Sequence, residues 1–339
     1  VRGILVAADL EVAHFADFIP NPTTDTVRAG AAMARKLGAV VVVGLGGGSS
    51  MDAAKAIAVE ATHPGSCWDY LWFRETPPTA ATLPVIAVTT TSGTGSQVTQ
   101  VAVVTNPAER CKSAIYHPLA FPRVALVDPA LMETVPPRMT ALTGFDAFTH
   151  AFESSIHVGT SPYVRLMALE AIGLVARYLP SAVRSGDPAA RDAMAWADTL
   201  AGMCIANAGV TLPHGMGMAI GGMYPHVAHG ESLAVTYPAF ARYTCDAAPE
   251  SFAWLARTLD PKLAGLPDDK AARCAAGAVE GLLEQVGIDL SLRGLGVPEQ
   301  ELDALAEACL VLPDYQNNPR VATLDDVQAI LRESYEPRG

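Results

Sequence analysis

Asp146 and His150 are the residues whose types and spacing most directly suggest metal chemistry in this sequence. They stand four positions apart, and on a helix two such side chains project from one face, one turn apart. His214 and His229 lie further along the chain, and each is followed by glycine. One carboxylate and three imidazoles form a nitrogen- and oxygen-rich set that suits Fe²⁺, Zn²⁺ or a similar divalent ion. Spacing alone leaves a second interpretation open, because single histidines and Asp/His pairs are often purely structural.

Two glycine-containing loops, residues 46–50 and 89–96, are candidate phosphate-binding segments. The first reads GGGSS and lies between a predicted strand and a predicted helix. There, glycines let a phosphate approach the backbone and the helix N-terminus offers free N–H groups. Alone, such a turn is tight packing about as often as a ligand site. The second loop, TTTSGTGS, contains only hydroxyl residues and glycines, and two such loops at strand ends suit a nucleotide lying across a sheet edge. Lys112 would add a charge-assisted bond, or it is an ordinary surface lysine.

The elements that must position these residues fall into two regions with different patterns of predicted secondary structure. In the first, strand and helix patterns alternate, which predicts an α/β domain with a Rossmann-like parallel sheet. The expected strands are 10–18, 40–43, 84–88, around 101–104 and 124–127, and the expected helices are 26–37 and 51–61. In the second, long amphipathic stretches predict an all-helical domain. These are 139–156, 163–183, 189–208, 230–245, 269–286 and 299–310. We therefore expect domains at 1–135 and 136–339.

Charge and composition exclude several classes of partner. The chain has 339 residues with 23 Lys and Arg against 35 Asp and Glu, a net charge of −12, so we expect neither nucleic-acid nor membrane binding. Six scattered cysteines and the lack of an apolar run of about 20 residues indicate a reduced, cytoplasmic protein. With half of the residues hydrophobic, the apolar surplus suits a homodimer or a larger homo-oligomer.

Several motifs, in order along essentially the whole chain, resemble the iron-containing, metal-dependent alcohol dehydrogenase family. The matching segments are PNPT at 20–23, GGGS at 46–49 with DAAKA at 52–56, TTSGT at 90–94, TGFDAFTHAFE at 143–153, HGM at 214–216, AHG at 228–230 and NPR at 318–320. Because these motifs are specific and come in the family's order, the resemblance is much stronger than a single glycine loop.

The resemblance implies a dehydroquinate synthase-like architecture, with a nucleotide-binding α/β domain, a helical domain and a cleft between them. It implies that Asp146, His150, His214 and His229 hold one divalent metal, with Fe²⁺ preferred over Zn²⁺ as the identity of the ion. It also implies that NAD or NADP binds at a set of residues that includes the two glycine-containing loops. The implied cofactor residues are Asn21, Gly48, Ser49, Asp52, Thr90, Thr94 and Lys112, and we add Gly47 and Thr91 from the same two loops. The implied reaction is hydride transfer between NAD(P)(H) and a primary alcohol or aldehyde, with the metal as Lewis acid.

Three departures from the family pattern bear on function. Members usually begin with a strand and a residue that helps to choose between NAD and NADP, and we expect this first segment to be missing before Val1. Many members carry a proton-relay histidine four residues after the one that matches His214, whereas this sequence has Met218 there. The interval from His214 to His229 is one residue longer than expected, which makes His226 a rival ligand or a substitute proton carrier. Water at the metal and the cofactor ribose hydroxyls are the other possible proton routes.

Other functions within the same fold stay open at this point. One is a maleylacetate reductase-like or polyol dehydrogenase, and another is a dehydroquinate synthase-like lyase, which binds NAD and a metal yet releases no reduced cofactor. A third is a nucleotide-binding protein that has lost turnover after the change to Met218. The segments around Asp146 and His229 favour the alcohol dehydrogenase.

Overall fold

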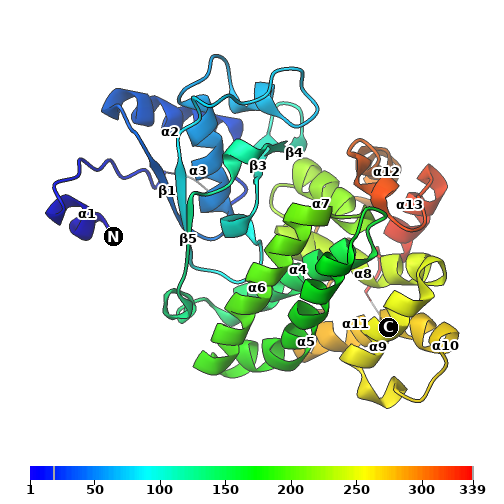
Figure 1. The fold of residues 1–339 in the computed structure, drawn as a ribbon. Coiled ribbons are helices and arrows are strands. Elements are labelled where there is room, and N and C mark those ends of the chain that lie inside the picture. Colours follow the sequence, from blue (N-terminus) through cyan, green and yellow to red (C-terminus); the bar gives the residue numbers. More distant parts are fainter. Residues whose placement is uncertain (18–19, 338–339) are drawn as a thin grey trace. The chain divides into compact units, whose positions relative to one another are not determined.

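The computed structural model describes residues 1–17 and 20–337, which fall into two compact units (Figure 1). Unit 1 consists of Val1–Thr89 and Gln100–Leu126, and unit 2 consists of Thr90–Thr99 and Val127–Gly339. The division after residue 135 stays a prediction. The compact units differ from this prediction in one respect that matters for the site. Residues 90–99, which contain most of the loop TTTSGTGS and are called the hydroxyl-rich loop below, group with the helices of unit 2.

Unit 1 is built around a three-stranded sheet in the order β1-β2-β5. Its strands are β1 (Val42–Gly46), β2 (Val85–Thr89) and β5 (Val124–Val127), and its helices are α1 (Arg2–Ala7), α2 (Thr24–Leu37) and α3 (Gly48–Glu60). β1 and β2 run parallel, which confirms the α/β class predicted for this region. The side chain of Thr23 caps α2, and Gly38 ends it in the left-handed conformation with φ +67°.

Two parts of unit 1 differ from the sequence prediction. The strand expected at 10–18 is wrong, because residues 10–17 have no regular secondary structure; Phe18 lies outside the described residues. Only Phe15 in this stretch packs against an apolar cluster, and a strand without a neighbouring strand lacks the backbone pairing that stabilises it. β3 (Val101–Asn106) confirms the strand expected around 101–104, but its antiparallel pairing with β4 (Cys111–Tyr116) in a hairpin was not predicted.

Unit 2 is helical in the part of the chain that the structure describes, as predicted. Its helices are α4 (Pro137–Ile156), α5 (Pro162–Ser185), α6 (Pro188–Ala208), α7 (Leu212–Met223), α8 (His229–Thr244), α9 (Pro249–Leu259), α10 (Asp268–Arg273), α11 (Ala275–Gln285), α12 (Leu302–Cys309) and α13 (Leu324–Glu333). The stretch expected at 269–286 is two helices that meet at Cys274, and α7 and α9 were not predicted.

The core of unit 2 contains an aromatic cluster centred on α4. Phe145, Phe148 and Phe152 lie at helical spacing, and their rings follow one another with centroids 5.4 and 6.5 Å apart. The ring of Tyr237 in α8 packs edge-on against Phe145, with centroids 5.5 Å apart. The ring of Phe252 in α9 packs edge-on against Phe152, with centroids 5.0 Å apart. All five side chains are fully buried, so α4 is held by large apolar contacts along one of its faces.

Helix α5 is long and apolar enough to cross a membrane by length and composition alone. It has 24 residues, and 44% of its most apolar window is buried inside the protein. It packs against α4 and α6, and its inward side chains, among them Ile172, Val175 and Leu179, belong to the main apolar cluster. These contacts are those of a core helix, which accounts for its apolar composition.

Candidate metal and nucleotide sites

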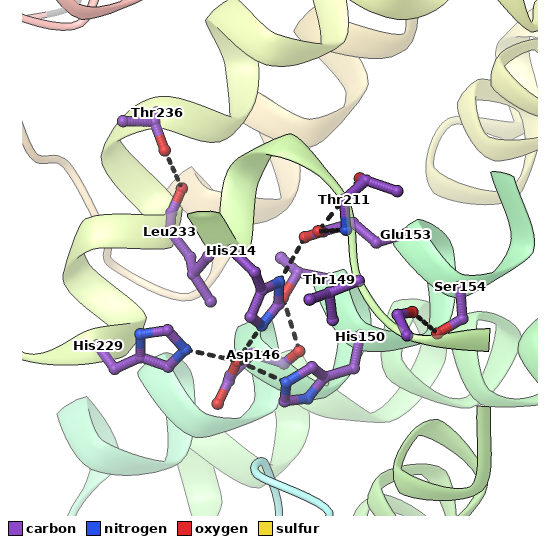
Figure 2. Close-up of polar contacts among 12 residues, drawn as sticks. Asp146, Thr149, His150, Glu153, Ser154, Thr211, His214, His229, Leu233 and Thr236 are labelled. Atoms are coloured by element: carbon purple, nitrogen blue, oxygen red, sulfur yellow. Dashed lines mark hydrogen bonds and ion pairs between the residues drawn. The ribbon is translucent and has the colours of Figure 1, made fainter. Parts of the chain in front are cut away.

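The four predicted metal ligands converge in unit 2, as Figure 2 shows. Asp146 and His150 come from α4, His214 from α7, and His229 is the first residue of α8. The Nε2 atoms of His150, His214 and His229 lie 3.6, 3.6 and 3.8 Å from Oδ1 of Asp146. Asp146, His214 and His229 each offer an atom within 4.8 Å of the other two. His150 stands beside this trio, with its ring centroid 4.5 Å from that of His214.

These distances fit an ion better than hydrogen bonds. Four ligands arranged tetrahedrally at about 2.1 Å from an ion lie about 3.4 Å from one another. Separations of 3.6–3.8 Å are close to that value and too long for N–H···O bonds. Moreover, Asp146 Oδ1 and His214 Nε2 are buried and have no hydrogen-bond partner among the described residues. Buried polar atoms without a partner are costly, and a bound cation would satisfy both.

A second layer of contacts fixes which nitrogen of each imidazole faces the cluster. Glu153, one further turn along α4, accepts from His214 Nδ1 at 2.8 Å and from the backbone N–H of Thr211 at 2.9 Å (Figure 2). The Gly93 carbonyl accepts from His150 Nδ1 at 3.1 Å. In both rings Nε2 is left to face Asp146, as metal-binding histidines require. Glu153 was not among the predicted site residues, although its spacing from Asp146 and His150, i+7 and i+3, places it on the same face of the helix.

The electrostatics of the cluster favour a charged carboxylate. Burial opposes ionisation of Asp146, but electrostatic attraction to His150, His229 and His214 outweighs it and holds the pKa well below its usual range. For His214, burial lowers the pKa, but Glu153 and Asp146 together raise it to about 10. A cation that binds at His214 Nε2 therefore competes with a proton for that imidazole.

Glycines beside the histidines allow three helices to approach closely enough for their side chains to meet. A Cβ atom at Gly230 would lie 2.7 Å from the carbonyl oxygen of Leu142 in α4. One at Gly217 would lie 3.1 Å from the hydroxyl of Ser232 in α8. Larger residues would push α8 away from α4 and α7, so Gly217 and Gly230 serve the geometry of the cluster.

His226 does not join the cluster. Its Nε2 lies 2.9 Å from the carbonyl oxygen of Leu295, so this ring ties the segment before α8 to the chain near residue 295. This placement gives no support to His226 as a rival ligand or proton carrier. Met218 lies on α7 one turn beyond His214 and is half-buried, and its role in a substrate pocket stays a prediction.

We expect His226→Ala to leave kcat and its pH dependence unchanged, because the imidazole is engaged at Leu295 rather than at the cluster. The measurement is aldehyde reduction between pH 6 and pH 9, with wild-type protein assayed in parallel. The loss of one hydrogen bond would lower the unfolding free energy by about 1 kcal/mol. A pH profile that loses one limb in the variant would return the relay role to His226.

Six of the predicted cofactor residues lie in unit 1: Asn21, Gly47, Gly48, Ser49, Asp52 and Lys112. Lys112 is buried rather than on the surface, and its Nζ donates to the side-chain carbonyl of Asn21 at 3.0 Å. The backbone N–H of Asn21 donates in turn to the hydroxyl of Ser49 at 3.1 Å. Asn21, with φ +59°, and Lys112 thus gather at the start of α3, where Gly47 and Gly48 form the helix N-terminus. This arrangement suits an anion at that terminus.

Asp52 has a structural contact within unit 1. Its carboxylate accepts from the backbone N–H of Val103 at 3.1 Å, which ties α3 to β3. The fully buried Lys55, one turn further along α3, donates to the carbonyl of Val101 at 2.7 Å, and burial lowers its pKa to about 8. Together these residues fix the helix that carries the glycine turn, and a contact of Asp52 with the cofactor stays a prediction.

The other predicted cofactor residues, Thr90, Thr91 and Thr94, belong to the loop that groups with unit 2. The Thr94 hydroxyl accepts from the backbone N–H of Ser96 at 3.3 Å and so shapes the turn. The same loop carries Gly93, whose carbonyl contacts His150. The threonines predicted to bind cofactor therefore share a loop with the carbonyl that contacts His150, and their contact with the cofactor stays a prediction.

Family models match almost the entire chain. The model described as Iron-containing alcohol dehydrogenase matches residues 1–129, and the one for the C-terminal part of the Fe-containing alcohol dehydrogenase family matches residues 140–335. The chain belongs to the iron-containing alcohol dehydrogenase family. It is thus an oxidoreductase of alcohols and aldehydes that uses a nicotinamide cofactor and a metal, as the sequence predicted.

Individual members of the iron-containing alcohol dehydrogenase family are similar over nearly the full chain. A 1,3-propanediol dehydrogenase of Klebsiella pneumoniae is 38% identical over 97% of this chain and 84% of its own. An NAD-dependent methanol dehydrogenase of Bacillus methanolicus is 36% identical over 96% and 85%. The solved structure of an archaeal halo-thermophilic alcohol dehydrogenase from a Red Sea brine pool superposes with a TM-score of 0.93 at 37% identity, covering 98% of this chain and 86% of that one.

Proposed function

We propose that Asp146, His150, His214 and His229 hold one divalent metal, Fe²⁺ before Zn²⁺, at which a small primary alcohol and its aldehyde are interconverted. The observation that supports this most is the meeting of three imidazole nitrogens around one buried carboxylate oxygen, with Asp146 Oδ1 and His214 Nε2 lacking hydrogen-bond partners among the described residues. When bound, the metal polarises the substrate carbonyl as a Lewis acid and the nicotinamide gives or accepts the hydride.

The residues of the chain have distinct tasks in this reaction. Asp146 supplies the one negative charge in the proposed ligand set. Glu153 keeps His214 in the tautomer whose Nε2 faces the cluster, and the Gly93 carbonyl does the same for His150. The half-buried Met218, one turn from His214, is proposed to line the substrate pocket. Its thioether carries no proton, so it favours an apolar substrate end and leaves proton transfer to other groups.

For the cofactor, we propose that the N-terminus of α3 binds the phosphates of NAD or NADP. Gly47, Gly48 and Ser49 are at that terminus, and the linked pair Asn21 and Lys112 stands beside it. Backbone N–H groups at a helix start and one lysine suit a pyrophosphate. Asp52, Thr90, Thr91 and Thr94 complete the proposed set. The NAD-dependent relative from Bacillus methanolicus supports NAD.

We also propose that the protein is a cytoplasmic homodimer or larger assembly that binds neither nucleic acid nor membranes. The net charge of −12 disfavours nucleic acid and anionic lipid. Exposed apolar side chains on α5 and α6, among them Tyr163, Leu166 and Trp196, are suited to burial against a second copy. A monomer in multi-angle light scattering would rule out the assembly.

The experiment that tests the proposed function uses protein stripped of metal with a chelator and then restored with Fe²⁺ or Zn²⁺. NADH and NADPH oxidation is followed with short, hydroxylated and aromatic aldehydes. We expect turnover only after metal is restored, with net loss of reduced cofactor. Bound metal is counted separately by elemental analysis, and one ion per chain is expected.

The outcomes separate the proposed function from its alternatives. Nucleotide binding without turnover under any metal would indicate a protein that has lost activity, and Met218→His would be the variant to examine next. Metal-dependent chemistry without net consumption of NADH would indicate a lyase of the same fold. Full turnover in metal-free protein would refute the proposed role of the Asp146 cluster.

A further inference from the structure

Asp198 of α6 is a fully buried carboxylate that is not among the proposed metal ligands. Its Oδ1 accepts from the backbone N–H of Gly95 at 2.8 Å, and its Oδ2 accepts from the side-chain amide of Gln97 at 2.8 Å. Both donors belong to the hydroxyl-rich loop, residues 90–99. A buried carboxylate is costly unless it is hydrogen-bonded, so these bonds hold the loop and the helix to one another.

The loop and α6 also meet backbone to backbone. Gly95 has φ +62°, and a Cβ atom on it would lie 2.4 Å from Cα of Gly202. A Cβ atom on Gly202 would lie 2.7 Å from Cα of Gly95. Asp198 and Gly202 are four positions apart, so one face of α6 offers both the acceptor and the space for the loop.

The opposite side of the loop touches α4. The Gly93 carbonyl accepts from His150 Nδ1 at 3.1 Å, and a Cβ atom at Gly93 would lie 2.5 Å from the carbonyl oxygen of Thr143. The loop therefore packs between α4 and α6. Gly93 makes the contact with α4, and Gly95, only two residues further along, makes the contact with α6. A shift of the loop away from Asp198 moves the carbonyl that orients His150.

We propose that Asp198 is a positioning residue for the metal site, acting through the loop and the Gly93 carbonyl on the orientation of His150. The inference rests on the proposed metal ligation by His150. Burial, together with repulsion from Asp146, raises the pKa of Asp198 to about 7, while hydrogen bonds from Gln97 and from the Gly95 and Gly93 amides favour its charged form. The loop donors thus recover part of the cost of placing a carboxylate there.

The test measures Co²⁺ binding to metal-stripped protein by competition with a chelator and by the visible absorption of the bound ion. Asp198→Ala is expected to raise the Kd for Co²⁺ about tenfold and to alter the absorption bands, since the tuning of a ligand through its hydrogen-bond partner is typically worth that much. Asp198→Asn keeps an acceptor for the Gly95 amide, so it is expected to weaken binding by a smaller factor. Asp192→Ala, an exposed change on the same helix, is the control and should bind as wild type.

Each result has a definite meaning, and thermal unfolding of the metal-free variants separates loss of fold from loss of metal affinity. Wild-type Kd and spectrum in Asp198→Ala would overturn the inference; if that variant does not fold, unchanged Co²⁺ binding by Asp198→Asn would do so. His150→Ala distinguishes this failure from that of the proposed function. If His150→Ala binds Co²⁺ like wild type, the ligand assignment is wrong. If it loses the tight site while both Asp198 variants keep it, only the positioning role is wrong.

Discussion

Asp146→Ala should leave the protein folded and able to bind NADH, yet lower kcat/KM for aldehyde reduction about a thousandfold, or about 4 kcal/mol of transition-state stabilisation. The physical reason is the position of Asp146 Oδ1, which lies 3.6–3.8 Å from all three histidine nitrogens. Without this carboxylate three imidazoles remain, two of them buried, and no negative charge among the proposed ligands offsets the cost of placing a divalent cation there. The measurement is steady-state kinetics together with the metal content of the purified variant.

Asp192→Ala again serves as a control, because it removes an exposed aspartate from unit 2 without touching the cluster. NADH binding, followed by the quenching of protein fluorescence, shows whether the loss is confined to the metal. A variant of Asp146 that retains one equivalent of tightly bound metal and wild-type kcat/KM would show that the reaction occurs elsewhere.

Glu153→Gln is expected to weaken metal binding by about 10–100-fold, even though Glu153 is not a proposed ligand. Its carboxylate accepts from His214 Nδ1 and from the backbone and hydroxyl of Thr211. The amide of glutamine replaces one acceptor oxygen by a donor, so one of these partners loses its bond. Glu153→Leu removes all of them and should lower the free energy of unfolding by about 3–5 kcal/mol. Metal titration and chemical denaturation measure the two effects.

Ser155→Ala provides a matched control on the same helix. Its buried hydroxyl donates to the carbonyl of Phe152 within α4, so the substitution also removes a buried hydrogen bond but leaves His214 untouched. We expect a modest loss of stability and an unchanged Kd for metal. Equal losses of metal affinity in Ser155→Ala and Glu153→Gln would mean that Glu153 acts only through general stability.

The proposed ligands could be found from the sequence because part of their geometry is local. Asp146 and His150 lie on one helix, and a spacing of four residues fixes their relative position whatever the tertiary structure. Placing His214 and His229 with them required the resemblance to the family, since nothing local connects α4 with α7 and α8. The alternation of strands and helices in the first part of the chain gave the fold class in the same local manner.

What could not be predicted depends on contacts between distant segments. The sequence of α7 contains four glycines, at 215, 217, 221 and 222, which lower helix propensity. The glycines allow close packing against α8 at positions such as 217. This tertiary packing stabilises the helix despite its low propensity. The contact of Asp198 with the loop joins residues 103 positions apart and leaves no local pattern. Residues 10–17 show the opposite case, where a local strand pattern has no strand to pair with.

Helix α4 carries two stripes on adjacent faces, and this affects how quickly a bound ion can leave. One stripe is the aromatic row Phe145, Phe148 and Phe152 in the core, and the other is Asp146, His150 and Glu153. Fraying of a terminus or movement of a surface loop leaves both stripes in place. Displacing Asp146 and His150 therefore requires a sub-global opening that also separates the aromatic rings, with a free energy near that of the core. We expect loop motion not to speed the loss of an ion through these two residues.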